Sequence, residues 1–391
     1  MSERGPGGCL PPAKKEGGPG GCLPPTKKIA IVGPAHPYKG GGARHTTELA
    51  HRLAAAGHEV VIESWRAQYP ARLYPGQQTV EEAEGEAFPA TRRRLAWYRP
   101  DGWIAAGRRL RRTDLVVFAL ITPVQVPAYL AMLAALRTGR RRPRVVVICH
   151  NVLPHERRPG DVPLVRALLR RADGVLVHSA EQAGLAQSLA PRTPVAVAAL
   201  PPHFPVVPFS SPTTDEAAVR LLFFGIVRPY KGLDVLLRAL ADVPRTVKLT
   251  VAGEFWGGTA GTEKLIADLG IGDRVTLRPG YVPASEIPAL FAAADVLVLP
   301  YREATASQNA LLAFAHGVPV ITTTAGTLAA HVTDGVNGLT VAPGDAGDML
   351  RALRSVSEPA SVARLRSGVR PVDPGPAWSD YLGALVTAAR T

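Results

Sequence analysis

The sequence has few cysteines, three in 391 residues. So few thiols in a chain of this length argue against a disulfide framework. No apolar signal segment opens the chain, because its N-terminus is rich in Gly, Pro and Lys. We therefore expect a cytoplasmic protein. No Asp-x-Asp triplet occurs anywhere, so a metal-chelated diphosphate would lack obvious ligands, and we expect no metal or other cofactor.

Aromatic residues are also scarce, at 6% of the chain. The arginine runs at 92–94, 108–112 and 140–144 are not interleaved with aromatic side chains that could stack on bases, which argues against nucleic acid. Positive charge is concentrated in residues 1–200, which hold 29 Lys and Arg against 15 Asp and Glu. This imbalance favours an anionic partner, such as an acidic membrane surface or a phosphate-bearing acceptor, with solubility as the alternative explanation.

One long uncharged run, Leu115–Leu136, has the length of a membrane span. Polar and proline residues at 122, 123, 125 and 127 interrupt it, so we favour a buried strand, a loop and an apolar helix. A second segment, Val162–Ala172, is predicted to be a helix with arginines on one side. It could rest on an anionic bilayer, but packing against a sheet is the favoured interpretation.

Composition divides the chain into five parts. The Gly/Pro-rich sequence GPGGCLPPAKK at residues 5–15 recurs with one change at residues 18–28, which predicts a disordered tail over residues 1–27. Residues 28–200 form a first domain, the Pro-rich segment 201–216 a linker, and residues 217–372 a second domain. Residues 373–391 are predicted to form a helix that packs back on the first domain. The stretch Tyr69–Arg112 is charged and irregular, and we expect loop with a short helix.

Apolar strands alternate with helical segments in both domains. Examples of the predicted strands are KIAIVG, RVVVIC and GVLVHS in the first domain and RLLFFG, VKLTVAGE and DVLVLP in the second. This alternation is typical of α/β domains with parallel, doubly wound sheets, similar to the Rossmann fold. Two such domains in tandem predict a cleft between them, at the carboxyl ends of the strands.

The most informative segment is FFGIVRPYKGLD, Phe223–Asp234. A buried strand ends at a glycine turn, and Arg228 and Lys231 precede an amphipathic helix. Two cations beside backbone N–H groups at such a turn can hold a diphosphate. The segment therefore predicts a ligand linked to a nucleoside diphosphate.

Three further segments predict ligand contacts at strand ends. The glycines at 40–42 let the backbone of the first loop approach a ligand closely, although a tight turn would need them as well. His150 directly follows the strand RVVVIC and is expected to face the cleft, with a structural imidazole as the alternative; His155 and Glu156 lie farther along the same loop. Residues 305–308 precede a predicted helix, where they can bind phosphate or sugar, or cap the helix.

With these residues in view, the chain resembles the retaining glycosyltransferases of the GT-B fold, family 4, from about Lys28 to about Arg390. The resemblance rests on ordered motifs that include IVGPAHPYKGGG, CHNVLPHE, FFGIVRPYKGLD, VAGEFW, RPGYVP and PYREATAS. Within the family, the chain is similar to the bacterial subgroup with HNVLPHE and FFGxxRPYKGLD motifs.

The resemblance implies that the second domain holds a nucleoside diphosphate sugar and that the first shapes the site of an unidentified acceptor. It implies catalytic roles for His150, which would touch the donor sugar, and for Arg228 and Lys231, which would bind the diphosphate. The other donor-binding residues that it implies are Gly41, Gly42, Gly225, Glu254, Gly280, Tyr281, Val282, Glu303, Thr305, Ala306, Ser307 and Gln308.

The sequence departs from the family at three glutamate positions, which hold Ala304, Leu312 and Ala330. Ribose recognition through position 312 is lost, and Glu303 is a candidate substitute. Without a carboxylate pair, front-face attack assisted by the leaving phosphate fits the implied retaining reaction better than a covalent intermediate. The same departures motivate a second interpretation, a catalytically silent sugar-nucleotide-binding accessory subunit. A third is a nucleotide-sugar epimerase, which would also use a two-domain cleft.

Overall fold

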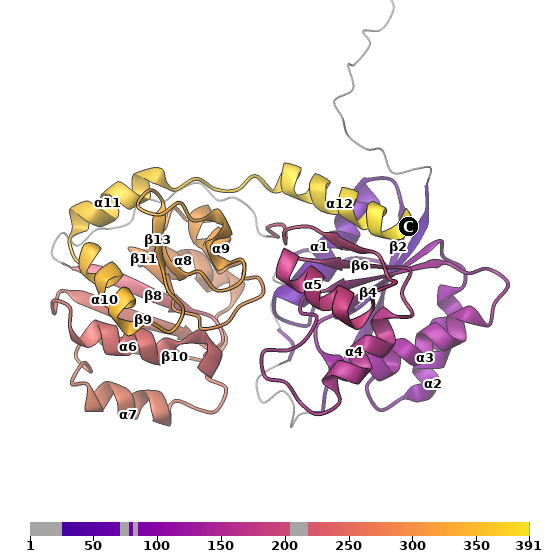
Figure 1. Cartoon of the computed structure of the whole chain (residues 1–391), viewed down its shortest axis with the longest axis horizontal. Coiled ribbons are helices and arrows are strands. Elements are labelled where there is room, and N and C mark those ends of the chain that lie inside the picture. Colours follow the sequence, from indigo (N-terminus) through magenta and orange to yellow (C-terminus); the bar gives the residue numbers. More distant parts are fainter. Residues whose placement is uncertain (1–25, 71–77, 81–84, 204–217, 391) are drawn as a thin grey trace, which may run out of the picture.

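The computed structural model describes residues 26–70, 78–80, 85–203 and 218–390. Nearly all of the predicted tail and most of the predicted linker lie outside these residues. The described chain forms two α/β domains, each built on a parallel sheet (Figure 1). The predicted fold class is therefore confirmed.

The first sheet has seven parallel strands in the order β3-β2-β1-β4-β5-β6-β7. Its strands are β1 (Lys28–Val32), β2 (Glu59–Ala67), β3 (Thr91–Ala96), β4 (Leu115–Leu120), β5 (Arg144–Cys149), β6 (Gly174–Val177) and β7 (Val195–Val197). All six residues of β4 are buried, because helices cover both faces of the sheet.

Helices on the two faces enclose two separate hydrophobic cores. The helices of this domain are α1 (Gly41–Ala55), α2 (Pro100–Leu110), α3 (Val126–Arg137), α4 (Asp161–Leu169) and α5 (Ala180–Leu189), with a 3₁₀ turn η2 (Pro123–Gln125) before α3. Apolar residues of α2, α3, α4 and α5 share one core, and Leu49, Ala50 and Leu53 of α1 share the other with the C-terminal helix.

Two sequence expectations for this domain need comment. The stretch Tyr69–Arg112 is expected to be loop with a short helix; the structure has a helix there, α2, but also the edge strand β3, which was not expected. The uncharged run Leu115–Leu136 forms β4, η2 and most of α3, as the favoured interpretation predicted. Among the described residues, no helix combines the length and apolar character needed to cross a membrane. The apolar side of α4, including Val165 and Leu168, is buried in the core.

The second sheet has six parallel strands in the order β10-β9-β8-β11-β12-β13. They are β8 (Val219–Phe224), β9 (Val247–Gly253), β10 (Val275–Pro279), β11 (Val296–Leu299), β12 (Val320–Thr323) and β13 (Gly338–Val341). The helices are α6 (Leu233–Ala241), α7 (Ala260–Asp268), α8 (Ile287–Ala292), α9 (Asn309–Ala315), α10 (Ala346–Ser355) and α11 (Pro359–Gly368), with 3₁₀ turns η3 (Pro229–Lys231), η4 (Ala284–Glu286) and η5 (Leu328–His331). Each sheet reverses its strand order beside its first strand, which is where α/β sheets bind ligands.

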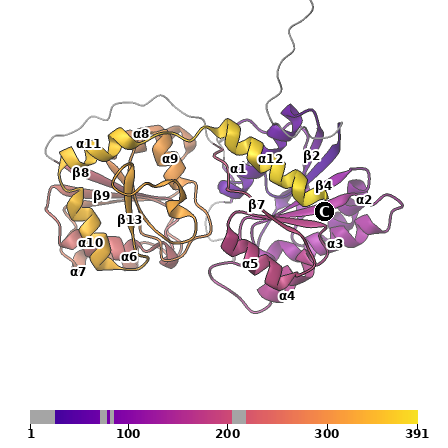
Figure 2. The same ribbon diagram turned by 45° about the horizontal axis from the view of Figure 1, so that its top comes forward.

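The last helix, α12 (Pro374–Arg390), returns to the first domain (Figure 1 and Figure 2). Its buried residues Trp378, Tyr381 and Leu385 complete the core that α1 covers, and the Trp378 indole N–H donates to the carbonyl of Pro202, 2.8 Å away. A Cβ at Gly174, at the start of β6, would lie 1.9 Å from the Ala388 carbonyl oxygen. The close contact of α12 with the sheet therefore requires glycine at position 174.

Candidate active site between the two domains

The turn after β8 brings Lys231 back against the strand end. Gly225 adopts a φ of +112°, which favours glycine, and a Cβ there would lie 3.5 Å from the Lys231 Nζ. The Lys231 ammonium donates to the Tyr301 hydroxyl, 2.9 Å away, and lies 4.6 Å from the centre of that ring. Burial lowers the pKa of Lys231, but the neighbouring Tyr301 and Tyr230 phenols more than offset this, so the net shift is upward. The amine is therefore a protonated cation at neutral pH.

Arg228, from the same turn, lines a pocket of about 260 Å³ that both domains enclose. Residues from the loop after β5, including His155 and Glu156, form part of its wall, and Tyr230 and Trp256 come from the second domain. The Arg228 guanidinium forms an ion pair with Glu156 and lies 4.6 Å from the centre of the Trp256 indole. The predicted cation therefore faces the space between the domains.

Other polar contacts also join the two domains. Lys39, in the loop after β1, forms an ion pair with Glu254 at the end of β9, and both side chains are largely buried. The His155 Nδ1 lies 3.4 Å from a carboxylate oxygen of Glu303, and the His155 ring stacks on Tyr230 with centroids 4.8 Å apart. Glu254 and Glu303, both predicted to bind the donor, thus contact the first domain directly.

The predicted base-binding turn follows β10 and lies beside the Lys39–Glu254 pair. Gly280 has a φ of +122°, and its N–H donates to the Gly253 carbonyl, 3.0 Å away. The Lys39 ammonium lies 5.1 Å from the centre of the Tyr281 ring, while Val282 is buried in the core of the second domain. The turn is therefore fixed at the interdomain edge of its sheet.

The loop before α9 holds residues 305–308, as predicted. Thr305 is buried, and its carbonyl accepts a hydrogen bond from the Thr327 hydroxyl. The Ser307 hydroxyl accepts from the Asn309 backbone N–H at 3.3 Å, and Ala306 is half-buried. The Gln308 amide donates to the Leu200 carbonyl of the first domain, 3.0 Å away. The Thr305 carbonyl, the Ser307 hydroxyl and the Gln308 amide N–H thus already form hydrogen bonds within the protein.

The glycine loop of the first domain leads directly into α1. Gly41 is exposed and has open space where a side chain would lie, whereas a Cβ at Gly42 would lie 2.3 Å from the Ile121 side chain. Ile121 also lines the pocket that contains Arg228. The start of α1 is therefore close to the interdomain pocket, and a side chain at position 42 would displace that of Ile121.

His150 has different surroundings. Its ring lies 4.9 Å from the His45 ring and 5.3 Å from the His178 ring, and His45 in turn stacks on Trp378 of α12. Burial, followed by the charges of His178 and His203, holds its pKa well below the usual value, so the imidazole is neutral. Its Nε2 is buried without a hydrogen-bond partner among the described residues. Its neighbour Asn151, and not His150, lines the pocket with Arg228.

Several residues of the site were missed by reasoning from the sequence. Lys39, Tyr230, Trp256 and Asn309 were not singled out, although the first three lie inside motifs that were. The Asn309 side chain donates to the Phe224 carbonyl at 2.9 Å and thereby ties α9 to the end of β8. No group of three or more His, Cys, Asp and Glu side chains in the described parts of the chain is arranged to hold a metal ion.

Two family models match the chain in sequence. One, described as "Glycosyltransferase Family 4", matches residues 39–199, and the other, described as "Glycosyl transferases group 1", matches residues 218–358. Together with two parallel-sheet domains facing one another, these matches define a glycosyltransferase of the GT-B type. The first domain belongs to glycosyltransferase family 4, and the second is a group 1 glycosyltransferase domain.

Curated relatives and solved structures agree with this assignment. A protein of Catenulispora acidiphila named D-inositol 3-phosphate glycosyltransferase 1 is 31% identical over 60% of this chain and 60% of its own length. A D-inositol 3-phosphate glycosyltransferase of Mycolicibacterium smegmatis is 35% identical over 39% of this chain and 35% of its own length. The matched parts thus span between 35% and 60% of the length of these relatives.

Among solved structures, Anabaena HepE in complex with UDP and glucose superposes with a TM-score of 0.70 at 16% identity, covering 92% of this chain and all of that one. A sucrose-phosphate synthase from Thermosynechococcus elongatus gives a TM-score of 0.69 at 20% identity over 92% of this chain and 98% of that one. At these identities the likeness establishes the fold.

Proposed function

We propose that this protein transfers a glycosyl group from a nucleoside diphosphate sugar to an acceptor hydroxyl, with retention at the anomeric carbon and without a metal ion. The observation that carries the proposal is the placement of Arg228 and Lys231 at the carboxyl end of β8, with Arg228 facing the pocket between the domains. A departing diphosphate gains negative charge as the sugar becomes cationic. Fixed cations that face this charge lower the barrier.

The other predicted site residues surround the same region. Gly225 has no side chain, so a diphosphate can approach the backbone and Lys231 closely. Exposed Gly41 lies at the start of α1, where helix N–H groups favour an anion. The His150 Nε2, which has no hydrogen-bond partner in the part of the chain that the structure describes, can bond a sugar hydroxyl that reaches it. Contacts to the base would come from Gly280, Tyr281 and Val282, and the remaining donor contacts from Glu254, Glu303 and residues 305–308.

Retention without a covalent intermediate is the mechanism that this set of residues favours. Ala304 and Leu312 occupy the positions where the resemblance to the family implies paired carboxylates, so neither side chain can act as a nucleophile there. An acceptor hydroxyl that attacks from the same face as the leaving diphosphate can pass its proton to a phosphate oxygen. Arg228 and Lys231 then stabilise the diphosphate as the glycosidic bond breaks.

The test is turnover of UDP-glucose by the Arg228→Ala/Lys231→Ala double variant, with D-inositol 3-phosphate as the first acceptor. These substrates are chosen because they occur in the descriptions of the solved and curated relatives. We expect kcat/KM to fall at least about 100-fold, since two charges facing the leaving group are lost. The control, Arg245→Ala/Lys264→Ala, removes two exposed cations of the same domain and should leave kcat/KM unchanged.

Donor affinity that survives in the double variant would contradict the proposal. Binding of donor without any turnover, including hydrolysis, would instead indicate the accessory subunit, and interconversion of donors without acceptor would indicate the epimerase. Activity that persists in EDTA and an unchanged anomeric configuration in the product, measured by NMR coupling constants, would support metal independence and retention.

A further inference from the structure

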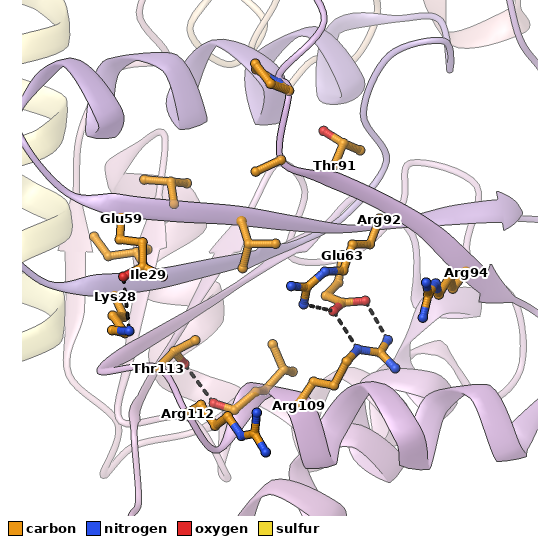
Figure 3. Close-up of a pocket in the computed structure, with 15 residues that line it drawn as sticks. Lys28, Ile29, Glu59, Glu63, Thr91, Arg92, Arg94, Arg109, Arg112 and Thr113 are labelled. Atoms are coloured by element: carbon orange, nitrogen blue, oxygen red, sulfur yellow. Dashed lines mark hydrogen bonds and ion pairs between the residues drawn. The ribbon is translucent and has the colours of Figure 1, made fainter.

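The outer edge of the first sheet carries an excess of positive charge. Residues 91–112 comprise β3, the turn that follows it and α2, and they hold eight arginines against one acidic residue, Asp101. Buried Glu63 of β2 accepts hydrogen bonds from Arg92 of β3 at 3.2 Å and from Arg109 of α2 at 2.9 and 2.7 Å (Figure 3). These bonds tie the strand and the helix to the sheet, and the segment keeps a large net positive charge.

The turn between β3 and α2 exposes two aromatic side chains, Trp97 and Tyr98. They are 41% and 50% exposed, and their rings lie edge to face with centroids 5.4 Å apart. The Trp97 backbone N–H donates to the Ala67 carbonyl of β2 at 2.9 Å. The Trp103 indole N–H of α2 donates to the Ala96 carbonyl of β3 at 2.7 Å. Hydrogen bonds on both sides of the turn therefore hold it in place, and both rings are presented to solvent in a fixed arrangement.

Exposed hydrophobic side chains are concentrated in the same segment. Six large ones are exposed among the described residues, and Trp97, Tyr98 and Ile104 are three of them. Ile104 lies on α2, one helical turn before the exposed Arg108. Scattered apolar side chains are ordinary on a protein surface, whereas a local concentration of them marks an interaction site. The segment is therefore a candidate docking surface that is both apolar and cationic.

Two arginines adjoin the aromatic pair. The exposed Arg66 of β2 donates from its guanidinium to the Tyr98 hydroxyl, 3.4 Å away. Arg99 follows Tyr98 and donates two hydrogen bonds to Asp101, at 2.9 and 2.6 Å, with both side chains more than half exposed. Trp and Tyr favour the headgroup level of a bilayer because their rings are apolar with a polar end, and guanidinium groups bind phosphates. The surface thus combines the two kinds of side chain that an anionic bilayer attracts.

A bilayer fits this surface better than a nucleic acid does. The planes of the Trp97 and Tyr98 rings are 80° apart, so two successive stacked bases could not both lie flat on them. The turn also lies near the interdomain pocket, since Ala67, which binds the Trp97 backbone, is two residues from Tyr69 in the wall of that pocket. A membrane in contact with the turn therefore lies close to the pocket.

We propose that the turn after β3 docks the first domain on an anionic lipid bilayer. Trp97 and Tyr98 enter the headgroup region, while Arg66 and Arg99 contact lipid phosphates. This docking surface goes beyond the proposed transfer reaction and uses none of the residues assigned to that reaction.

The first experiment sediments the full chain at low salt with phosphatidylcholine vesicles, with and without about 30% phosphatidylglycerol. We expect the chain to bind the acidic vesicles, and Trp97→Ser/Tyr98→Ser to weaken this binding at least about tenfold. The control, Val197→Ser/Val336→Ser, removes two similarly exposed apolar side chains from other parts of the chain and should leave binding within about twofold. A melting temperature for each variant shows that it is folded.

The charge of the surface is tested separately. We expect Arg66→Gln/Arg99→Gln to weaken binding to the acidic vesicles at least about tenfold, because the attraction to lipid phosphates is lost. The control, Arg245→Gln/Arg278→Gln, lowers the net charge by the same amount at two exposed arginines of the second domain. It should leave binding within about twofold, since those arginines lie outside the docking surface.

Fluorescence shows whether Trp97 enters the bilayer. Lipids brominated on their acyl chains quench an indole that inserts beside them, and we expect such quenching in the native chain. Trp97→Phe keeps an aromatic ring at the same place. This variant should therefore still bind the acidic vesicles but lose most of the quenching.

Four results would overturn the proposal. The first is a native chain that does not bind the acidic vesicles. The second is equal loss of binding in both charge-matched arginine variants, which would show a general effect of net charge. The third is undiminished quenching in Trp97→Phe, which would mean that a different face enters the bilayer. The fourth is release of the vesicles by a single-stranded RNA that no longer binds Trp97→Ser/Tyr98→Ser, which would identify a nucleic acid as the partner of this turn.

Discussion

Two groups of polar residues lie near the cleft, and they differ in their protonation: one group is neutral and the other is positively charged. The first is a histidine cluster, formed by His45, His150, His178 and His203, which α12 covers with Trp378 and Tyr381. The second is a cation pair, Arg228 and Lys231, with acidic and aromatic partners around it. Burial keeps the first group neutral, whereas the second keeps its charge and faces the interdomain pocket.

A position at the end of a strand therefore does not by itself decide whether a residue is charged or can reach a ligand. His150 and Arg228 both follow a strand of a parallel sheet, where ligands bind in this class of fold. His150 packs against His45 and His178, two rings that α12 contacts, whereas Arg228 lines the interdomain pocket. We therefore expect changes in the histidine cluster to alter stability and its pH dependence, and changes in the cation pair to alter donor binding.

The largest expected effect is acid sensitivity of the histidine cluster. Burial lowers the pKa of His178 to about 4, below its ordinary value of 6.5. Between these two pH values the unfolded chain binds a proton that the folded chain does not, so stability falls as the pH drops from 6.5 to 4. For His178 alone this amounts to about 3 kcal/mol.

The experiment measures the free energy of unfolding at pH 7 and at pH 4.5. It compares the native chain with the variants His178→Gln and His51→Gln. His51 lies outside the cluster, so His51→Gln should keep the pH dependence of the native chain. The His178→Gln variant should lose less stability than the native chain on acidification. An identical loss in all three proteins would show that other groups cause the acid sensitivity.

The next prediction compares one variant from each group, by its effect on activity and on thermal stability. Arg228→Gln should lower kcat/KM about 100-fold, since a charge that faces the leaving group is lost, and should leave the melting temperature within about 1 °C. His150→Gln should lower the melting temperature by several degrees because it disturbs a packed, buried cluster, in addition to any loss of activity. A stable His150→Gln variant with reduced kcat would mean that this ring acts on the substrate alone.

The central strands of both sheets could be predicted because parallel strands covered on two faces are continuous apolar runs, whereas β3, β7 and β13 were not predicted. Leu115–Leu120 and Arg144–Cys149 are examples. The sequence of β3, TRRRLA, gave no such signal, since an edge strand keeps charged side chains in solvent. The turn with Arg228 and Lys231 could be located because one short segment contains both cations.

The contacts of the site with the other domain could not be predicted in this way. Lys39 and Glu254 are 215 positions apart, and no local pattern pairs them. The histidine cluster likewise contains residues from four distant segments of the chain, and Trp378 of α12 stacks on His45. Periodicity and motif spacing describe one element at a time, whereas these contacts depend on how complete domains pack.

The smallest expected effect concerns Glu156, which joins the cation pair to the first domain. Its carboxylate pairs with the Arg228 guanidinium, although the Glu156 side chain is 53% exposed. An exposed ion pair contributes about 0.2–1 kcal/mol, so removing a carboxylate that competes with the diphosphate should tighten donor binding by roughly 1.4- to 5-fold. Calorimetry of Glu156→Gln at low salt measures the gain.

Glu286→Gln provides the matched control, because Glu286 forms a similarly exposed pair with Arg278 outside the pocket. Its donor affinity should equal that of the native chain. The gain in Glu156→Gln should shrink as salt is added, since ions screen the competing charge. Weaker binding in Glu156→Gln would contradict competition, because it would mean that the carboxylate holds Arg228 in the orientation that the diphosphate requires.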